Sequence, residues 1–397
     1  MKVLHVIDSE GLYGAEVMLL NLAKEQSKLG LQPIILNMRA SDSFENSLKG
    51  EASRNDIDFF IICIRTGPDI AGAIKIIRYA NAVGADIIHS HGYKSNILIG
   101  FIPKRARRLP IVTTIHGWTY IGGKPRMRLY EWLDACSLKF IDAVVLVNKA
   151  MLSNPRLKKL NQKKVFVVEN GIPVSGNSSP SYLSNFATSP PPCQQTQLTQ
   201  QMLDHTIIDF CKRGYTIGSI GRLSPEKCFK NLLEAIKIVS SDCTDIRLVI
   251  IGEGGEREML EKMIQQLGLL DRVMMPGYRN EAKRYIPYFK VFALSSLTEG
   301  LPITILEAMR EGVPILSTRV GGVPEALDQG KAGVLVDTSN INFLAQGIYR
   351  LRNDPELGKR VAERAKKIVS QNYSSQRMAM GYLNIYKHIT KNCFLAS

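Results

Sequence analysis

Short apolar runs, many of them rich in β-branched residues, alternate with segments of helical length along most of this chain of 397 residues. Continuous apolar runs of this kind are typical of parallel strands that are covered on both faces. In the first half they are KVLHVID (2–8), PIILNM (33–38), FFIICI (59–64), DIIHSH (86–91), IVTTIH (111–116), AVVLVN (143–148) and KVFVVEN (164–170). In the second half they are YTIGSIG (215–221), IRLVIIG (246–252), RVMMPG (272–277), VFALSS (291–296), PILST (314–318) and GVLVD (333–337). The alternation predicts an α/β protein with parallel sheets.

A segment of different composition separates the two series of strands. Residues 175–206 are rich in Ser, Pro, Gln and Thr and hold few aliphatic residues, so they cannot bury much apolar surface. We therefore expect a doubly wound domain at 1–173, a linker or insertion at 174–207 and a second doubly wound domain at 208–373. The end of the chain has helical character, and we expect a helix at about 374–392 to pack back on the first domain.

Composition narrows the class of protein. With 45% hydrophobic and 22% charged residues the chain is an ordinary globular protein. No apolar run reaches the roughly 18 residues needed to cross a bilayer, and Asp8 comes too early for a signal peptide. Seven cysteines are scattered without a Cys-x-x-Cys pair, which favours reduced thiols over a disulfide framework or a zinc ribbon. We expect a cytoplasmic protein.

The formal net charge of +15 raises the question of an anionic partner. Basic residues gather in three stretches of the first half: Lys104, Arg105, Arg107 and Arg108; Lys124, Arg126 and Arg128; and Arg156, Lys158, Lys159, Lys163 and Lys164. A solvated basic surface and an anionic membrane surface both account for them. The chain has no nucleic-acid-binding motif and no regular aromatic interleaving, so we do not expect nucleic acid as a partner. Of the specific partners, the inner face of the plasma membrane is favoured, with the protein attached peripherally.

Two cations follow the first strand of the second half. Arg222 and Lys227 stand on a loop between that strand and a helix. Ligands of α/β sheets bind at the carboxyl ends of the strands, where such a pair can neutralise a diphosphate. Taken alone, the two residues are better explained as solvated surface charges.

Two carboxylates, Glu299 and Glu307, flank the start of a predicted helix in the stretch EGLPITILEAM. Pro302 suits the first helical turn, and the free N–H groups of Thr304 and Ile305 can hold a phosphate. Glu307 lies too far along to be the helix cap. A carboxylate beside a phosphate site is useful if it accepts hydrogen bonds from a polyol such as ribose, and Glu299 can do the same for a second polyol. Helix electrostatics alone remains the alternative for either glutamate.

Two further stretches follow strands of the second half. Gly252 begins GEGG, whose spacing is not the dinucleotide fingerprint G-x-G-x-x-G. The backbone around Tyr278 and Arg279 can meet a flat base. Cations for a diphosphate and carboxylates for the hydroxyls on either side of it together describe a nucleotide sugar.

The second half resembles the donor-binding domain of the retaining family-four glycosyltransferases, which have the GT-B fold of two Rossmann-like domains facing across a cleft. The resemblance is carried by GRLSPEK (221–227), GEG (252–254), PGY (276–278) and EGLPITILEAM (299–309). It implies that Arg222 and Lys227 bind the diphosphate and that Glu307 binds the ribose hydroxyls. It also implies that Glu299 and nearby backbone amides hold the transferred sugar.

The first half is similar to the same family. DSEGLYGAE (8–16) matches the glycine-rich loop after the first strand, and DIIHSHGYKSN (86–96) and TTIHGW (113–118) match the histidine-bearing strand ends. The resemblance implies that Gly14 approaches the donor phosphates and the acceptor, and that His116 touches the sugar. Three features depart from the family pattern: Tyr13 and Cys228 stand where glycine is usual, and the 175–206 segment is long.

Two patterns resemble metal sites. His89 and His91 share one face of a predicted strand, but no Cys, Asp or Glu partner is evident, so hydrogen-bonded histidines are favoured over ligands. Asp56 and Asp58 mimic the Asp-x-Asp of the other glycosyltransferase fold, yet they precede a strand far from the donor elements. We expect neither a metal nor a cofactor other than the donor substrate.

The sequence therefore predicts a retaining hexosyl- or N-acetylhexosaminyltransferase that uses a nucleoside-diphosphate sugar. Its acceptor is expected to be a glycan or a lipid-linked molecule of cell-surface polysaccharide or glycolipid assembly. His116, Glu299, Arg222 and Lys227 are the expected catalytic set. The alternatives are a nucleotide-sugar epimerase with the GT-B fold and a non-catalytic nucleotide-sugar-binding protein. A dehydrogenase is disfavoured because GLYGAE lacks the third fingerprint glycine.

Overall fold

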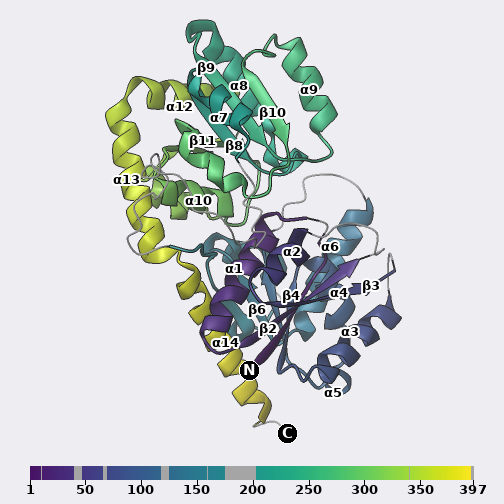
Figure 1. Cartoon of the computed structure of the whole chain (residues 1–397). Helices are drawn as coiled ribbons and strands as arrows, with labels where there is room; N and C mark the ends of the chain where they lie inside the picture. The colour runs from purple at the N-terminus through teal and green to yellow at the C-terminus, as the bar shows by residue number, and fades with distance from the viewer. Residues whose placement is uncertain are drawn as a thin grey trace, which may run out of the picture.

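Two parallel sheets form the frame of the molecule in the computed structural model (Figure 1). The structure describes residues 1–9, 11–39, 47–65, 69–117, 125–158, 160–174, 203–338 and 340–394. The first sheet has the order β3-β2-β1-β4-β5-β6-β7 and the second has the order β10-β9-β8-β11-β12-β13. All recorded strand pairs within these sheets are parallel. This arrangement of two doubly wound sheets confirms the predicted fold class.

The apolar runs of the sequence became the strands. In the first sheet these are β1 (Lys2–Ile7), β2 (Gln32–Arg39), β3 (Asp58–Cys63), β4 (Ile87–His91), β5 (Ile111–Ile115), β6 (Ala143–Leu146) and β7 (Val165–Val167). In the second they are β8 (Tyr215–Ile220), β9 (Ile246–Ile251), β10 (Val273–Gly277), β11 (Val291–Leu294), β12 (Ile315–Thr318) and β13 (Val334–Val336). Every residue of β4, β5 and β6 is buried, as expected for strands covered on both faces.

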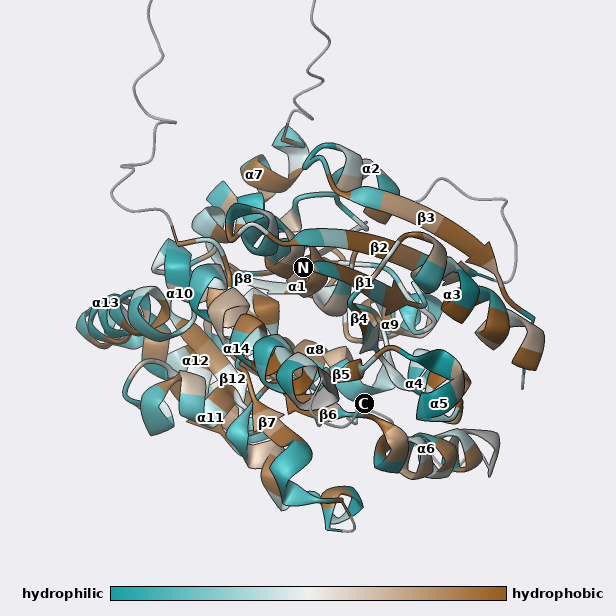
Figure 2. Cartoon of the chain, turned by 90° about the horizontal axis from the view of Figure 1, so that it is seen from below, coloured by the Kyte–Doolittle hydropathy of each residue, from teal (hydrophilic) through white to brown (hydrophobic). Residues whose placement is uncertain are grey.

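Helices cover the sheets. Those before the segment at 175–202 are α1 (Gly14–Lys28), α2 (Ser47–Ser53), α3 (Ile70–Ala82), α4 (Tyr93–Gly100), α5 (Lys104–Arg107) and α6 (Pro125–Ser137). Those after it are α7 (His205–Lys212), α8 (Phe229–Asp242), α9 (Arg257–Gln266), α10 (Ile303–Glu311), α11 (Val323–Ala326), α12 (Ile341–Asn353), α13 (Pro355–Asn372) and α14 (Ser375–Phe394). Figure 2 shows strands such as β2 and β3 coloured mostly as hydrophobic, whereas the outlying α13 is mostly hydrophilic.

Helix α14 leaves the second half of the chain and runs along the first. In Figure 1 it lies in yellow beside the purple α1. The crossing is fixed at Ile172, whose N–H donates to the Tyr373 carbonyl at 2.9 Å and whose carbonyl accepts from Ser375 N–H at 2.8 Å. Tyr382 and Tyr386 of α14 are fully buried under the first sheet. The last helix of the chain therefore covers part of one face of the first sheet.

The predicted 174–207 linker lies largely outside the described residues, of which none fall between 175 and 202. Helix α7 begins within the predicted linker, capped by the Asp204 side chain, which accepts from Thr206 N–H at 3.0 Å. Within the described part of the chain, no helix is both long enough and apolar enough to span a lipid bilayer.

Candidate functional site

A cavity of about 340 Å³ lies where the two sheets face each other, at the carboxyl ends of their strands. Ten of the eleven residues singled out in the sequence line it: Gly14, His116, Arg222, Lys227, Gly252, Tyr278, Arg279, Glu299, Thr304 and Glu307. The eleventh, Ile305, has a side chain that is fully buried within α10. Topology therefore collects residues that are spread from 14 to 307 in the sequence.

Two loops of the second sheet are packed backbone to backbone at the floor of the site. A Cβ on Gly252 would stand 1.8 Å from the Gly221 carbonyl, and one on Gly254 would stand 2.3 Å from the Leu223 carbonyl. Both glycines have positive φ, at 155° and 158°. The Leu223 N–H also donates to the Glu253 carbonyl at 2.9 Å. Glycine is required here because the loop that carries Arg222 rests directly on the loop after β9.

Lys227 and Glu299 form an ion pair in the cavity, with 2.5 Å between Nζ and Oε1. The side chains are 20% and 7% exposed, so water screens the pair little. Ser296 Oγ donates to the same carboxylate oxygen at 2.6 Å, and Ser295 Oγ donates to the Lys227 carbonyl at 3.0 Å. The sequence assigned these two residues to different parts of a ligand, and the structure shows that they also neutralise each other.

Arg222 meets the first half of the chain. Its guanidinium carbon lies 4.4 Å from the centre of the Tyr13 ring, so the ring stacks beneath the cation. The Tyr13 N–H donates to Glu16 Oε2 at 3.0 Å. Burial raises the pKa of the Glu16 carboxyl, while hydrogen bonds and the Arg222 charge lower it.

Glu307 lies one turn into α10 and is buried. Burial raises its pKa to about 7, against the opposing charges of Lys283 and Arg310. Among the described residues, none donates a recorded hydrogen bond to this carboxylate. Helix α10 begins at Ile303, and Pro302 is its N-cap. The sequence analysis placed this proline in the first helical turn, so it lies just before the predicted position. The N–H groups of the first turn keep the orientation that suits an anion.

The predicted role of Arg279 concerned its backbone, and its side chain has partners of its own. Its guanidinium donates to the Asp204 carboxylate at 3.0 Å and to the Pro276 carbonyl at 2.6 Å, so the side chain is engaged with α7 and its own loop. Tyr278 beside it is 36% exposed and borders the cavity, and partial burial of the ring raises the pKa of its phenol.

Three residues that the sequence analysis did not assign to the site also line the cavity: Glu16, Asn170 and Lys283. Asn170 joins the two halves, since its Nδ2 donates to the Leu301 carbonyl at 2.8 Å. Its buried Oδ1 has no partner among the described residues and is an acceptor available to a hydroxyl. The acid of GLYGAE at the start of a helix was a usable signal for Glu16. Lys283 had none, because it lies in a short 3-10 helix, Ala282–Tyr288, whose sequence matches no motif.

His116 follows β5 and faces the second half. A Cβ on Gly300 would stand 1.9 Å from the His116 carbonyl, so the residue after Glu299 rests on the first residue after β5. Burial lowers the pKa of the His116 imidazole to about 4, and the ring is neutral near pH 7.

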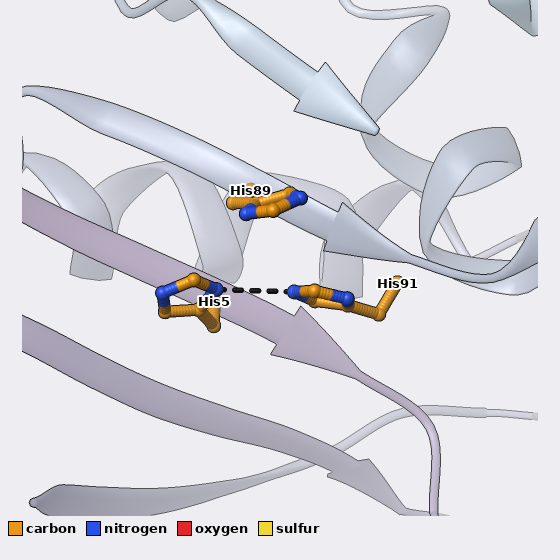
Figure 3. A group of neighbouring side chains, drawn as sticks. All are labelled: His5, His89 and His91. Atoms are coloured by element: carbon orange, nitrogen blue, oxygen red, sulfur yellow. Dashed lines mark hydrogen bonds between the residues drawn. The ribbon is translucent and has the colours of Figure 1, made fainter. Parts of the chain in front are cut away.

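The structure separates the two patterns that resembled metal sites: the histidine pair lies close to the cavity, and the aspartate pair does not line it. His89 and His91 are hydrogen-bonded as predicted, His89 to Tyr386 and Thr114, and His91 to His116. The structure adds His5 as a third histidine, with ligand atoms of His5, His89 and His91 all within 4.8 Å (Figure 3). Asp58 opens β3 at the edge of the first sheet, and neither it nor Asp56 lines the cavity.

Comparison with known proteins identifies the class. The model for "Glycosyl transferases group 1" matches residues 204–368, and the model for "Glycosyltransferase Family 4" matches residues 13–175. Together with the fold, they define a glycosyltransferase with the GT-B architecture. The chain belongs to the retaining glycosyltransferases of family four, as its motifs predicted.

Individual relatives are distant. The chain is 25% identical to the N-acetyl-alpha-D-glucosaminyl L-malate synthase of Bacillus anthracis over 82% of its length and 80% of the relative's. It is 25% identical to the Escherichia coli UDP-Gal:alpha-D-GlcNAc-diphosphoundecaprenol alpha-1,3-galactosyltransferase over 73% of its length and 72% of the relative's. Among solved structures, Anabaena HepE in complex with UDP-glucose is 19% identical, with a TM-score of 0.77 over 98% of this chain and 100% of that one. At this identity the likeness to HepE concerns the fold.

Proposed function

We propose that the protein transfers a hexosyl or N-acetylhexosaminyl group from a uridine-diphosphate sugar to a hydroxyl of a glycan or lipid-linked acceptor. The arrangement of Arg222, Lys227, Glu299 and Glu307 around one cavity carries this proposal. UDP-sugars appear in the names of a curated relative and of a solved structure with the same fold. The family's retaining chemistry then keeps the anomeric configuration.

The positive groups act where charge develops. As the bond between the anomeric carbon and the phosphate oxygen breaks, negative charge grows on the departing diphosphate. Arg222, Lys227 and the N–H groups at the start of α10 stabilise that charge. Lys227 then exchanges part of its contact with Glu299 for the phosphate, which leaves a Glu299 oxygen free to accept from a sugar hydroxyl.

The remaining polar groups orient the donor. Glu307 accepts hydrogen bonds from ribose hydroxyls, and Tyr278 and the backbone of Arg279 border the base. The acceptor hydroxyl forms the new bond to the anomeric carbon on the face that the diphosphate leaves, and its proton passes to the departing phosphate oxygen. Closure of the two halves excludes water from this step.

The direct test uses the purified full chain with a panel of UDP-, GDP-, ADP- and dTDP-sugars. We expect one UDP-sugar to raise the melting temperature and to be turned over slowly, with release of UDP. Conversion of the sugar nucleotide into its epimer without release of UDP would show the epimerase, and binding without any turnover would show the non-catalytic protein.

A lipid surface is the proposed location of the acceptor. Helices α4 and α6 pack together (Figure 2), and exposed aromatic residues lie on and next to them. Trp132 of α6 is 62% exposed, Phe101 directly after α4 is 42% exposed, and Phe140 in the short 3-10 helix Leu138–Phe140 after α6 is 56% exposed. Exposed Arg105 and Lys139 lie in the same part of the chain. Aromatic side chains beside cations suit the interface of an anionic membrane.

Vesicle co-sedimentation tests this surface. We expect binding to vesicles that contain phosphatidylglycerol, weaker binding to phosphatidylcholine vesicles, and loss of binding at raised salt or in the double variant Trp132→Ala, Phe140→Ala. Leu270→Ala is the matched control, because Leu270 is 66% exposed but lies in the second half. Equal binding to both vesicle types, or none, would contradict the proposal.

A further inference from the structure

A chain of hydrogen bonds runs from His116 at the cavity, across neighbouring strands of the first sheet, to helix α1. His116 Nε2 lies 3.2 Å from His91 Nδ1, and His91 Nε2 lies 3.0 Å from His5 Nδ1. His5 Nε2 in turn lies 2.8 Å from Gln26 Oε1 on α1. Figure 3 shows the contact between His5 and His91, with His89 beside them. The rings come from adjacent strands, since β1 pairs with β4 and β4 with β5.

Gln26 determines which atom donates at each step of these hydrogen bonds. Its Nε2 donates to the Tyr386 hydroxyl at 3.1 Å, so its Oε1 faces His5 and can only accept. His5 must therefore carry its proton on Nε2, which leaves Nδ1 as an acceptor. Burial lowers the pKa of His5 and of His116 to about 4 and that of His91 well below its usual value, so each ring holds a single proton at neutral pH.

The proton on His5 in turn fixes the protons on His91 and His116. His91 donates from Nε2 to His5 and accepts at Nδ1, and His116 then donates from Nε2 to His91. The second nitrogen of His116 is left without a proton, on a ring that lines the cavity. If the Gln26 amide had the opposite orientation, the ring proton of each of the three histidines would sit on the other ring nitrogen. His116 would then carry its proton on Nδ1 and donate from that atom instead of accepting.

We propose that Gln26, His5 and His91 are positioning residues that fix the tautomer of His116, so that it offers a hydrogen-bond acceptor to the donor sugar. This rests on the proposed function and deepens it: the transferred sugar presents a hydroxyl to His116. A neutral hexose or N-acetylhexosamine satisfies that acceptor, whereas the carboxylate of a hexuronic acid repels it. Helix α14 takes part in this hydrogen-bond chain, because its Tyr386 hydroxyl accepts from Gln26 Nε2 and holds the amide in place.

A metal ion at the same histidines is the competing explanation. The lone pair of His5 Nδ1 is already used by the N–H of His91, and His89 is engaged with Tyr386 at 2.7 Å and Thr114 at 2.8 Å. A metal would have to displace these protons and break the chain that ends at His116. The hydrogen-bonded arrangement accounts for every described ring nitrogen of the three residues without one.

Nitrogen-15 NMR of the histidine rings in the full chain tests the proposal, and six histidines keep the spectrum tractable. In the wild type we expect His116 to be protonated at Nε2. Gln26→Leu and Tyr386→Phe should give a mixture of the two tautomers and lower kcat/KM for the donor by about tenfold, the value of one hydrogen bond of about 1.4 kcal/mol. Gln26→Glu keeps the acceptor and should keep the tautomer.

Tyr79→Phe is the matched control, because it removes a buried tyrosine hydroxyl that has no partner among the described residues. An unchanged His116 tautomer in Gln26→Leu and Tyr386→Phe would overturn the proposal. Stoichiometric binding of Zn²⁺ to the wild type, with loss of the ring N–H signals of His5 and His91, would also overturn it. The NMR result does not depend on turnover, so a failure of the proposed transferase activity is recognised separately.

Discussion

At the scale of single residues, the Lys227–Glu299 ion pair links stability to the donor binding that we propose. Lys227→Ala should leave a buried carboxylate unpaired and lower the free energy of unfolding by about 3 kcal/mol, besides weakening donor binding. The double variant Lys227→Met, Glu299→Gln should recover most of that stability while staying inactive. Chemical denaturation and donor titration measure the two effects; a stable and active Lys227→Ala would contradict both.

Glu307 gives a prediction with a defined sign. Its folded pKa of about 7 lies above its ordinary value of 4.5, so between these pH values the folded state binds more protons than the unfolded state, and stability falls as pH rises. Glu307→Gln should remove this dependence, stabilise the ligand-free protein at pH 8 by about 1 to 3 kcal/mol and weaken donor binding. Glu311→Gln, on the same helix but outside the cavity lining, is the control. Identical stability curves for wild type and Glu307→Gln between pH 5 and 8 would refute the assignment.

Tyr13 directly precedes α1 in the loop after β1. Because its ring lies under Arg222, Tyr13→Leu should raise the KM for the donor several-fold, in line with about 1 kcal/mol for a partly buried cation–π contact. Tyr13→Phe keeps the ring and should retain the wild-type KM. If both variants behave alike in steady-state assays, the ring contributes nothing to the placement of Arg222.

At the scale of elements, the thirteen apolar runs of the sequence match the strands β1 to β13, because buried parallel strands leave an unambiguous apolar signal. The cavity-lining loops were also recognisable, since each follows a strand. Pairwise contacts such as Lys227 with Glu299 and Arg222 with Tyr13 were not. They depend on rotamers and on how two sheets face each other, which no local pattern in the chain encodes. His5 was missed for the same reason, as its neighbours His89 and His91 come from another strand.

The loop after β9 gives an element-scale prediction. Gly252→Ala would force its Cβ into the Gly221 carbonyl, so we expect a loss of about 2 kcal/mol or more and a misplaced Arg222 loop with weakened donor binding. Gly255→Ala is the control, because open space surrounds that position in the same loop. Melting curves and donor titrations of the two variants should differ clearly; equal values would show that the loops are not held by this contact.

At the scale of the whole molecule, the buried histidines predict acid sensitivity. Between pH 4 and 6.5 His5 and His116 bind protons in the unfolded state but not in the folded state, so stability falls as the pH falls. Each should cost about 2 kcal/mol at pH 5 relative to pH 7. His5→Gln should flatten the lower part of the curve, as judged by denaturant midpoints from pH 7 to 5. His205→Gln is the control, since His205 is an exposed residue of α7.

The return of α14 to the first sheet has a consequence for engineering. A hybrid protein that takes its second half from a relative cannot be made with one crossover, because the segment supplied after residue 174 would bring a foreign last helix. Two junctions are needed, one near Ile172 and one near Ser375, where the two strands of chain meet side by side. Under the proposed function, specificity for the sugar nucleotide is then exchanged as a cassette, while Tyr386 keeps its hydrogen bonds to His89 and Gln26.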